Sequence, residues 1–487
     1  MYLGIDLGTS GVKAIILDAK QQVRASFTAP LAVSRPRPLW SEQDPRDWWR
    51  ATDEAVRAVL RDVDGGAIEA VGLSGQMHGA TLLAGDDSVL RPAILWNDGR
   101  SERACARLLE REPRLPAITG NLAMPGFTAP KLVWVAEHEP EVFARVARVL
   151  LPKDYLRLRM TGEYLSDRSD SAGTLWLDVA RRDWSDEMLA ATGLTRAAMP
   201  GLVEGSEPAG TLRAQVAEAW GLRRVPVAGG AGDQAAGAIG AGVVDRTRTS
   251  LSLGTSGVLF VADAAYRANP ERAVHSFCHC LPDTWHRMSV ILSAASCLAW
   301  AAPLLGFRDV AALLAAVEAD GRPADVLFLP YLSGERTPHN DASAKGVFFG
   351  LHHDTNAAAL GRAVLEGVAY AFADARDVLF GRDEAPGEIA VIGGGSRSGL
   401  WGRILASVLD EELTYRAAAE VGPALGAARL ARLAVTGEAP VAVATAPPAT
   451  DVVAPDARLR ERYAEGLPRY RALYAALREE FRRGAES

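Results

Sequence analysis

The sequence Leu7-Gly8-Thr9-Ser10-Gly11-Val12 occurs a second time, residue for residue, as Leu253-Gly254-Thr255-Ser256-Gly257-Val258. Each copy lies between two short apolar runs that have the pattern of strands, so each predicts a hairpin turn. Glycine, threonine and serine are ordinary turn residues, and shared turn chemistry is one explanation of the repeat. Six identical residues in matched surroundings are better explained by two related domains that open with the same hairpin.

The pattern around each copy predicts an α/β domain. Short strands joined by short connections favour antiparallel hairpins, and helical spacing of apolar residues follows them. We expect strands over residues 2–6, 12–17, 22–28, 67–74, 250–254 and 257–263, and helices over 48–60, 234–242 and 400–409. Residues 190–228 are predicted as helices and loops. The tail after Pro440 is predicted as a linker followed by a packing helix over 459–483. The boundary near 243–249 gives domains over 1–245 and 246–487.

Composition narrows the classes of function. The 487 residues are 48% hydrophobic, which is enough for two cores, and the net charge is −7. There is no long basic run, which argues against nucleic acid or an anionic membrane as a partner. An acid interrupts the first apolar run and no uncharged run of ~18 apolar residues occurs, so neither a signal peptide nor a membrane span is predicted. The four cysteines are sparse, and we expect a protein of the reducing cytoplasm.

Turns rich in glycine and hydroxyl side chains are suited to phosphate, because they gather backbone N–H groups around a concavity. Two such turns facing each other predict a nucleotide in an interdomain cleft, although the chain has no P-loop motif. A third glycine-rich stretch, VIGGGSRS at 391–398, follows a predicted strand, and we interpret it as a platform for adenine or ribose. The predicted ATP-binding residues are Gly8, Thr9, Ser10, Lys13, Gly254, Thr255, Ser256, Gly394, Gly395 and Ser398.

Two carboxylates are the candidate catalytic residues. Asp6 precedes the first turn, whereas Ser252 holds the matching place before the second. A carboxylate beside phosphates repels them unless a cation intervenes, so Asp6 predicts Mg²⁺, held directly or through water. Asp233 follows GGAG at 229–232, where a helix is expected to begin. It is either a helix N-cap or a base that accepts the proton of an attacking hydroxyl, and the glycines before it favour close contact with a substrate.

A cluster of polar and aromatic residues follows two predicted strand ends, in SGQMHG at 74–79 and WNDGR at 96–100. Ligands of α/β domains bind at strand ends, and a polyol needs both hydrogen bonds and an apolar face. The predicted sugar-binding residues are Met77, His78, Trp96, Asn97 and Asp98, together with Asp233. The alternative is that single histidines and tryptophans here are structural. The run HSFCHC at 275–280 is interpreted as a half-buried strand rather than as a zinc site.

Longer strings resemble the FGGY carbohydrate kinases over nearly the whole chain. They are GIDLGTS at 4–10, GFTAPKLVW at 126–134 and GVFFGL at 346–351, the last running to Glu366. Ala359 departs from the family pattern, in which a polar residue is expected. The resemblance implies an actin-like, ribonuclease-H-like fold in two domains, with ATP in the catalytic cleft between them. It also implies that Asp233 is the general base and that Asp6 lies near magnesium-bound phosphates.

More particular strings resemble the members of this family that phosphorylate D-xylulose. They are SGQMHGA at 74–80, ILWNDGR at 94–100, LPKDYLRLRM at 151–160, HSFC at 275–278 and YLSGERTPH at 331–339. Members are often homodimers, so the resemblance allows a dimer. Three alternatives stay open: a kinase for another polyol such as ribulose, gluconate, fuculose or glycerol, an actin-like ATPase without a sugar site, and a non-catalytic sugar sensor.

Overall fold

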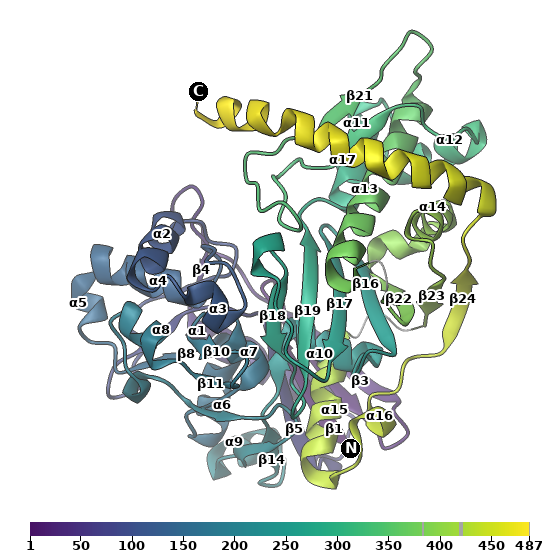
Figure 1. Cartoon of the computed structure of the whole chain (residues 1–487). Coiled ribbons are helices and arrows are strands. Elements are labelled where there is room, and N and C mark those ends of the chain that lie inside the picture. Colours follow the sequence, from purple (N-terminus) through teal and green to yellow (C-terminus); the bar gives the residue numbers. More distant parts are fainter. Residues whose placement is uncertain (382–383, 418–421, 487) are drawn as a thin grey trace.

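The strands of the computed structural model, which describes residues 1–381, 384–417 and 422–486, gather mainly into two seven-stranded sheets, one in each half of the chain (Figure 1). The first sheet has the order β13-β14-β5-β1-β2-β3, with β15 paired to β5. Its strands are β1 (Tyr2–Leu7), β2 (Gly11–Leu17), β3 (Val23–Pro30), β5 (Ala70–Gly75), β13 (Pro208–Thr211), β14 (Pro226–Ala228) and β15 (Ala231–Gly232). β1, β2 and β3 form the predicted antiparallel hairpins, and β5 runs parallel to β1.

The second sheet repeats this arrangement in the order β18-β19-β17-β16-β22-β23-β24. Its strands are β16 (Arg248–Leu253), β17 (Gly257–Asp263), β18 (His275–Cys278), β19 (Trp285–Ile291), β22 (Glu388–Ile392), β23 (Leu413–Arg416) and β24 (Ala449–Val453). β16 and β17 form the second hairpin, β19 is antiparallel to β17, and β22 is parallel to β16. The strand pairing around the two turns is therefore the same, which confirms the duplicated α/β fold predicted from the repeat.

Two helices cover opposite faces of the first sheet. α1 (Pro45–Val59) begins after the N-cap Asp44 and packs against β2 and β3. α15 (Gly422–Thr436) comes from the far end of the chain and packs against β1 and β5, where Figure 1 shows it in yellow-green. Its backbone approaches so closely that a Cβ at Gly72 of β5 would lie 1.8 Å from the carbonyl oxygen of Ala427. Only glycine fits at that position.

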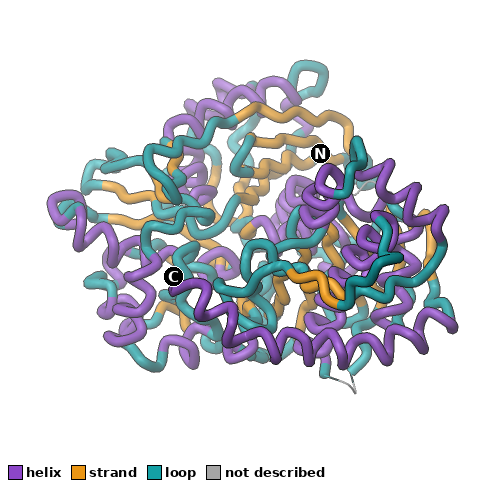
Figure 2. The backbone as a smooth tube through the Cα atoms, turned by 90° about the horizontal axis from the view of Figure 1, so that it is seen from above, coloured by secondary structure: helices purple, strands orange, loops and turns teal. Residues whose placement is uncertain are grey.

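The core of the second domain is formed around the long helix α13 (Ala357–Phe380), with α11 (Ala295–Leu304), α12 (Val310–Asp320) and α14 (Gly399–Leu409) around it. The terminal helix α17 (Ala457–Glu486) lies across the outside of this domain (Figures 1 and 2). It buries Tyr463 and Tyr470 completely, which confirms the predicted packing helix.

The remaining elements connect and extend these layers. In the first domain they are β4 (Glu42–Gln43), β6 (Thr81–Leu83), β7 (Ala93–Ile94), α2 (Glu102–Arg111), α3 (Leu115–Thr119), α4 (Thr128–His138), α5 (Pro140–Phe143), β8 (Arg148–Leu150), α6 (Pro152–Thr161), β9 (Leu165–Asp167), α7 (Arg168–Ala172), β10 (Leu177–Asp178), β11 (Asp183–Trp184), α8 (Asp186–Ala191), β12 (Gly201–Val203), α9 (Ala214–Trp220) and α10 (Asp233–Ala241). Later in the chain they are β20 (Leu327–Leu329), β21 (Val347–Phe349) and α16 (Pro440–Val443). Short 3₁₀ turns cover Gly65–Ala67, Arg196–Ala198, Pro270–Arg272 and Gly394–Arg397.

Three expectations need correction. Residues 190–228 contain the strands β12, β13 and β14 in addition to helices and loops. The predicted linker after Pro440 contains β24, which forms the edge of the second sheet. The strand β18 is fully buried rather than half-buried, because helices and loops of the first domain cover the face that was expected to be open. Among the described helices, none is both long and apolar enough to cross a membrane.

Candidate active site

Asp6 lies near the end of β1, opposite Lys13 on β2 and Ser74 on β5. Its Oδ1 atom is buried and has no hydrogen-bond partner among the described residues. Burial raises the pKa of Asp6 to about 6, although the Ser74 hydroxyl beside the carboxylate and the charge of Lys13 oppose this. A buried carboxylate oxygen without a partner costs free energy unless a proton or a cation meets it.

Asp233 is the first residue of α10, and the N-cap position belongs to Gly232. The capping alternative for Asp233 therefore does not apply. Burial raises the pKa of Asp233 to about 7, and the negative charge of Asp6 raises it further. The two carboxylates thus interact, and a group with a pKa near neutrality is suited to accepting a proton at physiological pH.

Two cavities meet at Asp233. The larger has a volume of about 470 Å³ and receives walls from both domains. All five predicted sugar-binding residues line it, together with Asp233 and Ser256 of the second turn; they are Met77, His78, Trp96, Asn97 and Asp98. The apolar part of its wall includes Phe127, Phe277 and Met288. The cavity therefore offers the polar groups and apolar faces that a small polyol requires.

The smaller cavity has a volume of about 280 Å³ and is also lined by Asp233. Ser252, Ala390 and Gly393 of the second sheet line it together with Pro423 at the start of α15. The third glycine-rich stretch thus reaches this cavity through Gly393. Its other predicted members, Gly394, Gly395 and Ser398, do not line this cavity. A Cβ at Gly395 would contact Leu253, Ser398 caps α14 by accepting from the Trp401 N–H, and Gly394 has open space around it.

The two repeated turns have the same sequence but close through different hydrogen bonds. In the first, the Gly8 N–H donates to the Gly11 carbonyl at 2.9 Å, and in the second the Gly254 N–H donates to the Ser256 carbonyl at 3.1 Å. The backbone N–H of Ala294 donates to the carbonyl of Thr255 at 2.9 Å, which ties the second turn to α11. Ser10 is exposed at the tip of the first turn.

Thr9 connects the first turn to the predicted sugar wall. Its hydroxyl donates to Gln76 Oε1 at 3.1 Å and accepts from the indole N–H of Trp96 at 3.0 Å. Gln43 Nε2 donates to the Thr9 carbonyl at 2.7 Å. Gln43 and Gln76 were not predicted from the sequence, since a lone glutamine near a strand end carries no signal of its own.

The sugar wall is fixed by its own hydrogen bonds. His78 adopts a left-handed backbone conformation, and its Nδ1–H donates to the Gly173 carbonyl at 2.6 Å. Burial lowers the pKa of His78 to about 3, so the ring is neutral. The buried Lys131 donates from Nζ to the carbonyls of His78 and Gly126, at 2.8 and 2.7 Å. Lys131 lies in the string GFTAPKLVW, which was noted for its resemblance without a role for the lysine.

Trp96, Asn97 and Asp98 differ in what they leave available to a ligand. Trp96 is 49% exposed, and Asn97 is exposed beside it. Both carboxylate oxygens of Asp98 already accept hydrogen bonds, from the Ser41 N–H at 2.6 Å and from the backbone and guanidinium of Arg100. Asp98 therefore shapes the loop through protein contacts, and its contact with a sugar stays a prediction.

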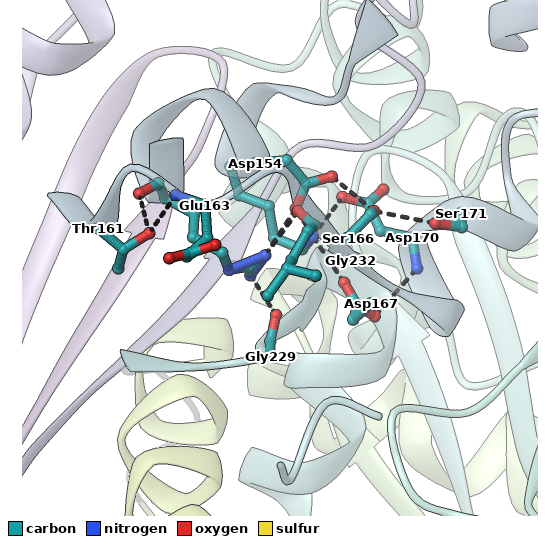
Figure 3. A network of polar contacts seen from close by, with 12 residues as sticks. Asp154, Thr161, Glu163, Ser166, Asp167, Asp170, Ser171, Gly229 and Gly232 are labelled. Atoms are coloured by element: carbon teal, nitrogen blue, oxygen red, sulfur yellow. Dashed lines mark hydrogen bonds and ion pairs between the residues drawn. The ribbon is translucent and has the colours of Figure 1, made fainter. Parts of the chain in front are cut away.

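A fully buried ion cluster lies behind the site (Figure 3). Lys153 Nζ lies 2.6 Å from carboxylate oxygens of Asp154 and Asp167 and 3.2 Å from Asp170. Burial raises the pKa of Asp170 well above its usual value. Removing one member of such a cluster leaves an unpaired buried charge, which is strongly destabilising.

The cluster holds the turn that precedes Asp233. The Arg157 guanidinium contacts both Asp154 and the carbonyl of Gly229. The Gly232 N–H donates to Ser169 Oγ at 3.3 Å. Both ends of the glycine-rich approach to Asp233 are thus fixed by buried polar groups, several of which come from the string LPKDYLRLRM.

The fold and the two-cavity site define a two-domain carbohydrate kinase, and comparison with known proteins agrees. Residues 1–240 match the N-terminal domain of the FGGY family of carbohydrate kinases, and residues 249–435 match its C-terminal domain. The chain belongs to this family.

Its relatives identify one branch. A xylulose kinase of Escherichia coli is 56% identical over 99% of this chain and 98% of its own length. A xylulose kinase of Klebsiella pneumoniae is 59% identical over 90% of this chain and 91% of its own. A crystal structure described as a xyloylose kinase from Brucella ovis superimposes with a TM-score of 0.95 at 51% identity, covering 98% of this chain and 99% of the other.

Proposed function

We propose that the chain transfers the γ-phosphoryl group of ATP to D-xylulose, giving ADP and D-xylulose 5-phosphate. The family uses ATP, and relatives at 56–59% identity act as xylulose kinases. The observation that carries the proposal is the position of Asp233, a carboxylate with a pKa of about 7 on the wall shared by two cavities.

In this mechanism, D-xylulose occupies the larger cavity and Asp233 accepts the proton of its terminal hydroxyl as that oxygen attacks the γ-phosphorus. The nucleotide lies on the other side, with its phosphates between the turns at 8–10 and 254–256. Phosphoryl transfer has a loose transition state, so catalysis comes mainly from positioning and charge neutralisation. Enclosing the cleft excludes water, which would otherwise be the acceptor.

We also propose Asp6 as the residue that holds Mg²⁺. Its buried Oδ1 atom without a partner and the second carboxylate nearby are a setting in which a cation fits. Within the described ranges, no group of three or more His, Cys, Asp or Glu is arranged around a common point for a metal. Mg²⁺ commonly takes one or two carboxylates together with water and phosphate oxygens, and it would neutralise phosphate charge here.

The proposal is tested by ADP release from the full chain with ATP, Mg²⁺ and a panel of D-xylulose, D-ribulose, gluconate, fuculose and glycerol. We expect D-xylulose to give the highest kcat/KM and a product carrying phosphate on C5, checked by ³¹P NMR. Release at the same rate without any sugar would favour an ATPase. Turnover with another polyol but only basal release with D-xylulose would contradict the assigned substrate.

A further inference from the structure

One cationic side chain in the wall of the larger cavity has no part in the mechanism above. Arg336 comes from the second domain and lines the same cavity as the sugar-binding residues predicted in the first domain. Among the residues that the structure describes, no carboxylate lies within ion-pair distance of its guanidinium. Removing an arginine from water without an ion-pair partner costs free energy. We therefore expect either a ligand or another protein contact at this guanidinium.

The supporting contact is a relay of three side chains across the domain interface. Asn121 of the first domain donates from Nδ2 to the carbonyls of Thr119 and Ser276, at 2.7 and 2.9 Å. These bonds fix its amide so that Oδ1 faces His275 Nδ1 at 3.1 Å. Because an amide oxygen only accepts, Nδ1 carries the proton of His275.

That tautomer determines what the other ring nitrogen does. His275 is buried, and burial lowers its pKa well below the usual value, so the ring carries one proton only. Nε2 is therefore an acceptor, and Arg336 Nη1 donates to it at 3.1 Å. The relay runs from Arg336 to His275 to Asn121 and holds the guanidinium plane in one orientation.

The rest of the guanidinium remains available. Arginine has five N–H donors, and His275 takes one of them. No described residue accepts from the other four, and the guanidinium lines the cavity. His78 of the first domain lines the same cavity, and the charge of Arg336 contributes to the lowering of its pKa. The Phe127 ring contacts histidines of both domains, with ring centres 4.8 Å from His78 and 5.6 Å from His275.

We propose that Arg336 is a specificity-determining residue that donates hydrogen bonds from the second domain to oxygen atoms of the bound ketose. The inference rests on the proposed function and adds to it. His78, Trp96 and Asn97 belong to the first domain, so a sugar that also bonds to Arg336 bridges the two domains. Sugar binding then stabilises the arrangement in which the cleft is enclosed.

The test compares Arg336→Met, Arg336→Lys and, as a matched control, Arg322→Met in the full chain. Arg322 is an exposed arginine of the same domain that pairs with Asp320. It does not line the cavity. We expect Arg336→Met to raise the KM for D-xylulose by about tenfold to hundredfold, the range for a lost charge-assisted hydrogen bond. The KM for ATP should stay within about twofold, and Arg336→Lys should recover part of the loss.

Two further readouts separate sugar binding from a structural role. The melting temperature of the free protein should match wild type, whereas its rise on adding D-xylulose should shrink in Arg336→Met. An unchanged KM for D-xylulose, or an equal rise for sugar and ATP with a lower melting temperature, would overturn the inference. Asn121→Ala removes the end of the relay, and it should raise the sugar KM by a smaller factor even if Arg336→Met fails to fold.

Failure of the proposed function gives a different pattern. If wild type does not phosphorylate D-xylulose, the assigned substrate is wrong, and the same variants are then compared with the polyol that it does accept. Arg336 would still be required for the KM of that polyol, and an unaffected KM would again overturn the inference.

Discussion

The proposed chemistry depends on two carboxylates whose ionisation is opposed by burial. Asp6 and Asp233 are 227 positions apart in the chain, yet the negative charge of Asp6 raises the pKa of Asp233. Burial raises their pKa values to about 6 and about 7. Such a pair is useful because bound Mg²⁺ and substrate can offset the repulsion that the free protein bears.

Asp233→Asn should abolish most turnover while stabilising the free protein. Loss of a general base reduces kcat by about 10²–10⁴-fold. Because the folded protein retains a proton on Asp233 from pH 3.8 to about 7 that the unfolded chain has lost, the free energy of unfolding falls as pH rises through that window. The asparagine lacks this penalty, which is at most about 4 kcal/mol. Melting curves at pH 4 and pH 8 should show a gain for the variant at pH 8 only.

Asp6→Asn is the matched variant, because it removes the other member of the pair. As pH rises from 3.8 to about 6, the free energy of unfolding of wild type should again fall relative to that of the variant, because the pKa of Asp6 is raised in the folded protein. The effect on activity should differ from that of Asp233→Asn. The Mg²⁺ concentration for half-maximal rate should rise, with little change in the KM for D-xylulose. If Asp6→Asn has the same Mg²⁺ dependence as wild type, the metal assignment is wrong. For wild type, kcat/KM should rise with pH through about 7 as Asp233 loses its proton.

At the scale of elements, Asp233 is positioned by the contact between α10 and α15. The two backbones approach closely at one point, where a Cβ at Gly426 of α15 would lie 1.8 Å from the carbonyl oxygen of Ala236 on α10. The sequence predicted α10 from its small residues, but it did not show that α15 would be the partner. Local patterns identify an amphipathic or small-residue helix, whereas its partner depends on contacts far apart in the chain.

Gly426→Ala should push α10 away from α15 and displace Asp233. Overpacking of this kind typically costs about 1–3 kcal/mol, and rigid backbone atoms here leave little room to relax. We expect a lower melting temperature together with a lower kcat. Gly237→Ala on α10 is the control, because its Cβ would meet nothing closer than 3.9 Å. That change should raise the free energy of unfolding by about 0.5–1 kcal/mol. Equal melting temperatures for the two variants would show that the contact is not tight.

The elements that sequence patterns predicted well are those with a strong local signal. The hairpin strands β1, β2, β16 and β17 alternate around recognisable turns, and α1 begins at Asp44-Pro45. β24 was missed because it is a short, largely exposed edge strand that exists through its pairing with β23. Site residues follow the same rule. Asp6 and Asp233 lie next to glycine-rich turns that the sequence shows, whereas Arg336 could be noticed only because it lines the cavity in the structure.

At the scale of the whole molecule, each half of the sequence builds its own sheet, but the packing of the first sheet also depends on the second half. The first sheet is covered on one face by α15, which is encoded at 422–436 beyond the second hairpin. The domain boundary predicted between residues 245 and 246 stays a prediction. In the structure, the chain forms most of the second domain and then returns to the first domain at α15. Residues of both domains line the larger cavity.

A fragment of residues 1–245 should therefore not reach the stability of the intact chain. Without α15 it exposes the buried face formed by Tyr2, Ile15, Leu17 and Ala70, which α15 covers through Leu425 and Ala428. Loss of this apolar burial, and of the glycine-lined contact at Gly72, removes support from β1 and β5 together. Circular dichroism should show a broad, low-temperature transition and aggregation for the fragment. The intact chain should unfold in a sharper transition at higher temperature. A fragment that unfolds sharply near the same temperature would show that α15 is dispensable, and the first domain would then end where the sequence repeat indicates.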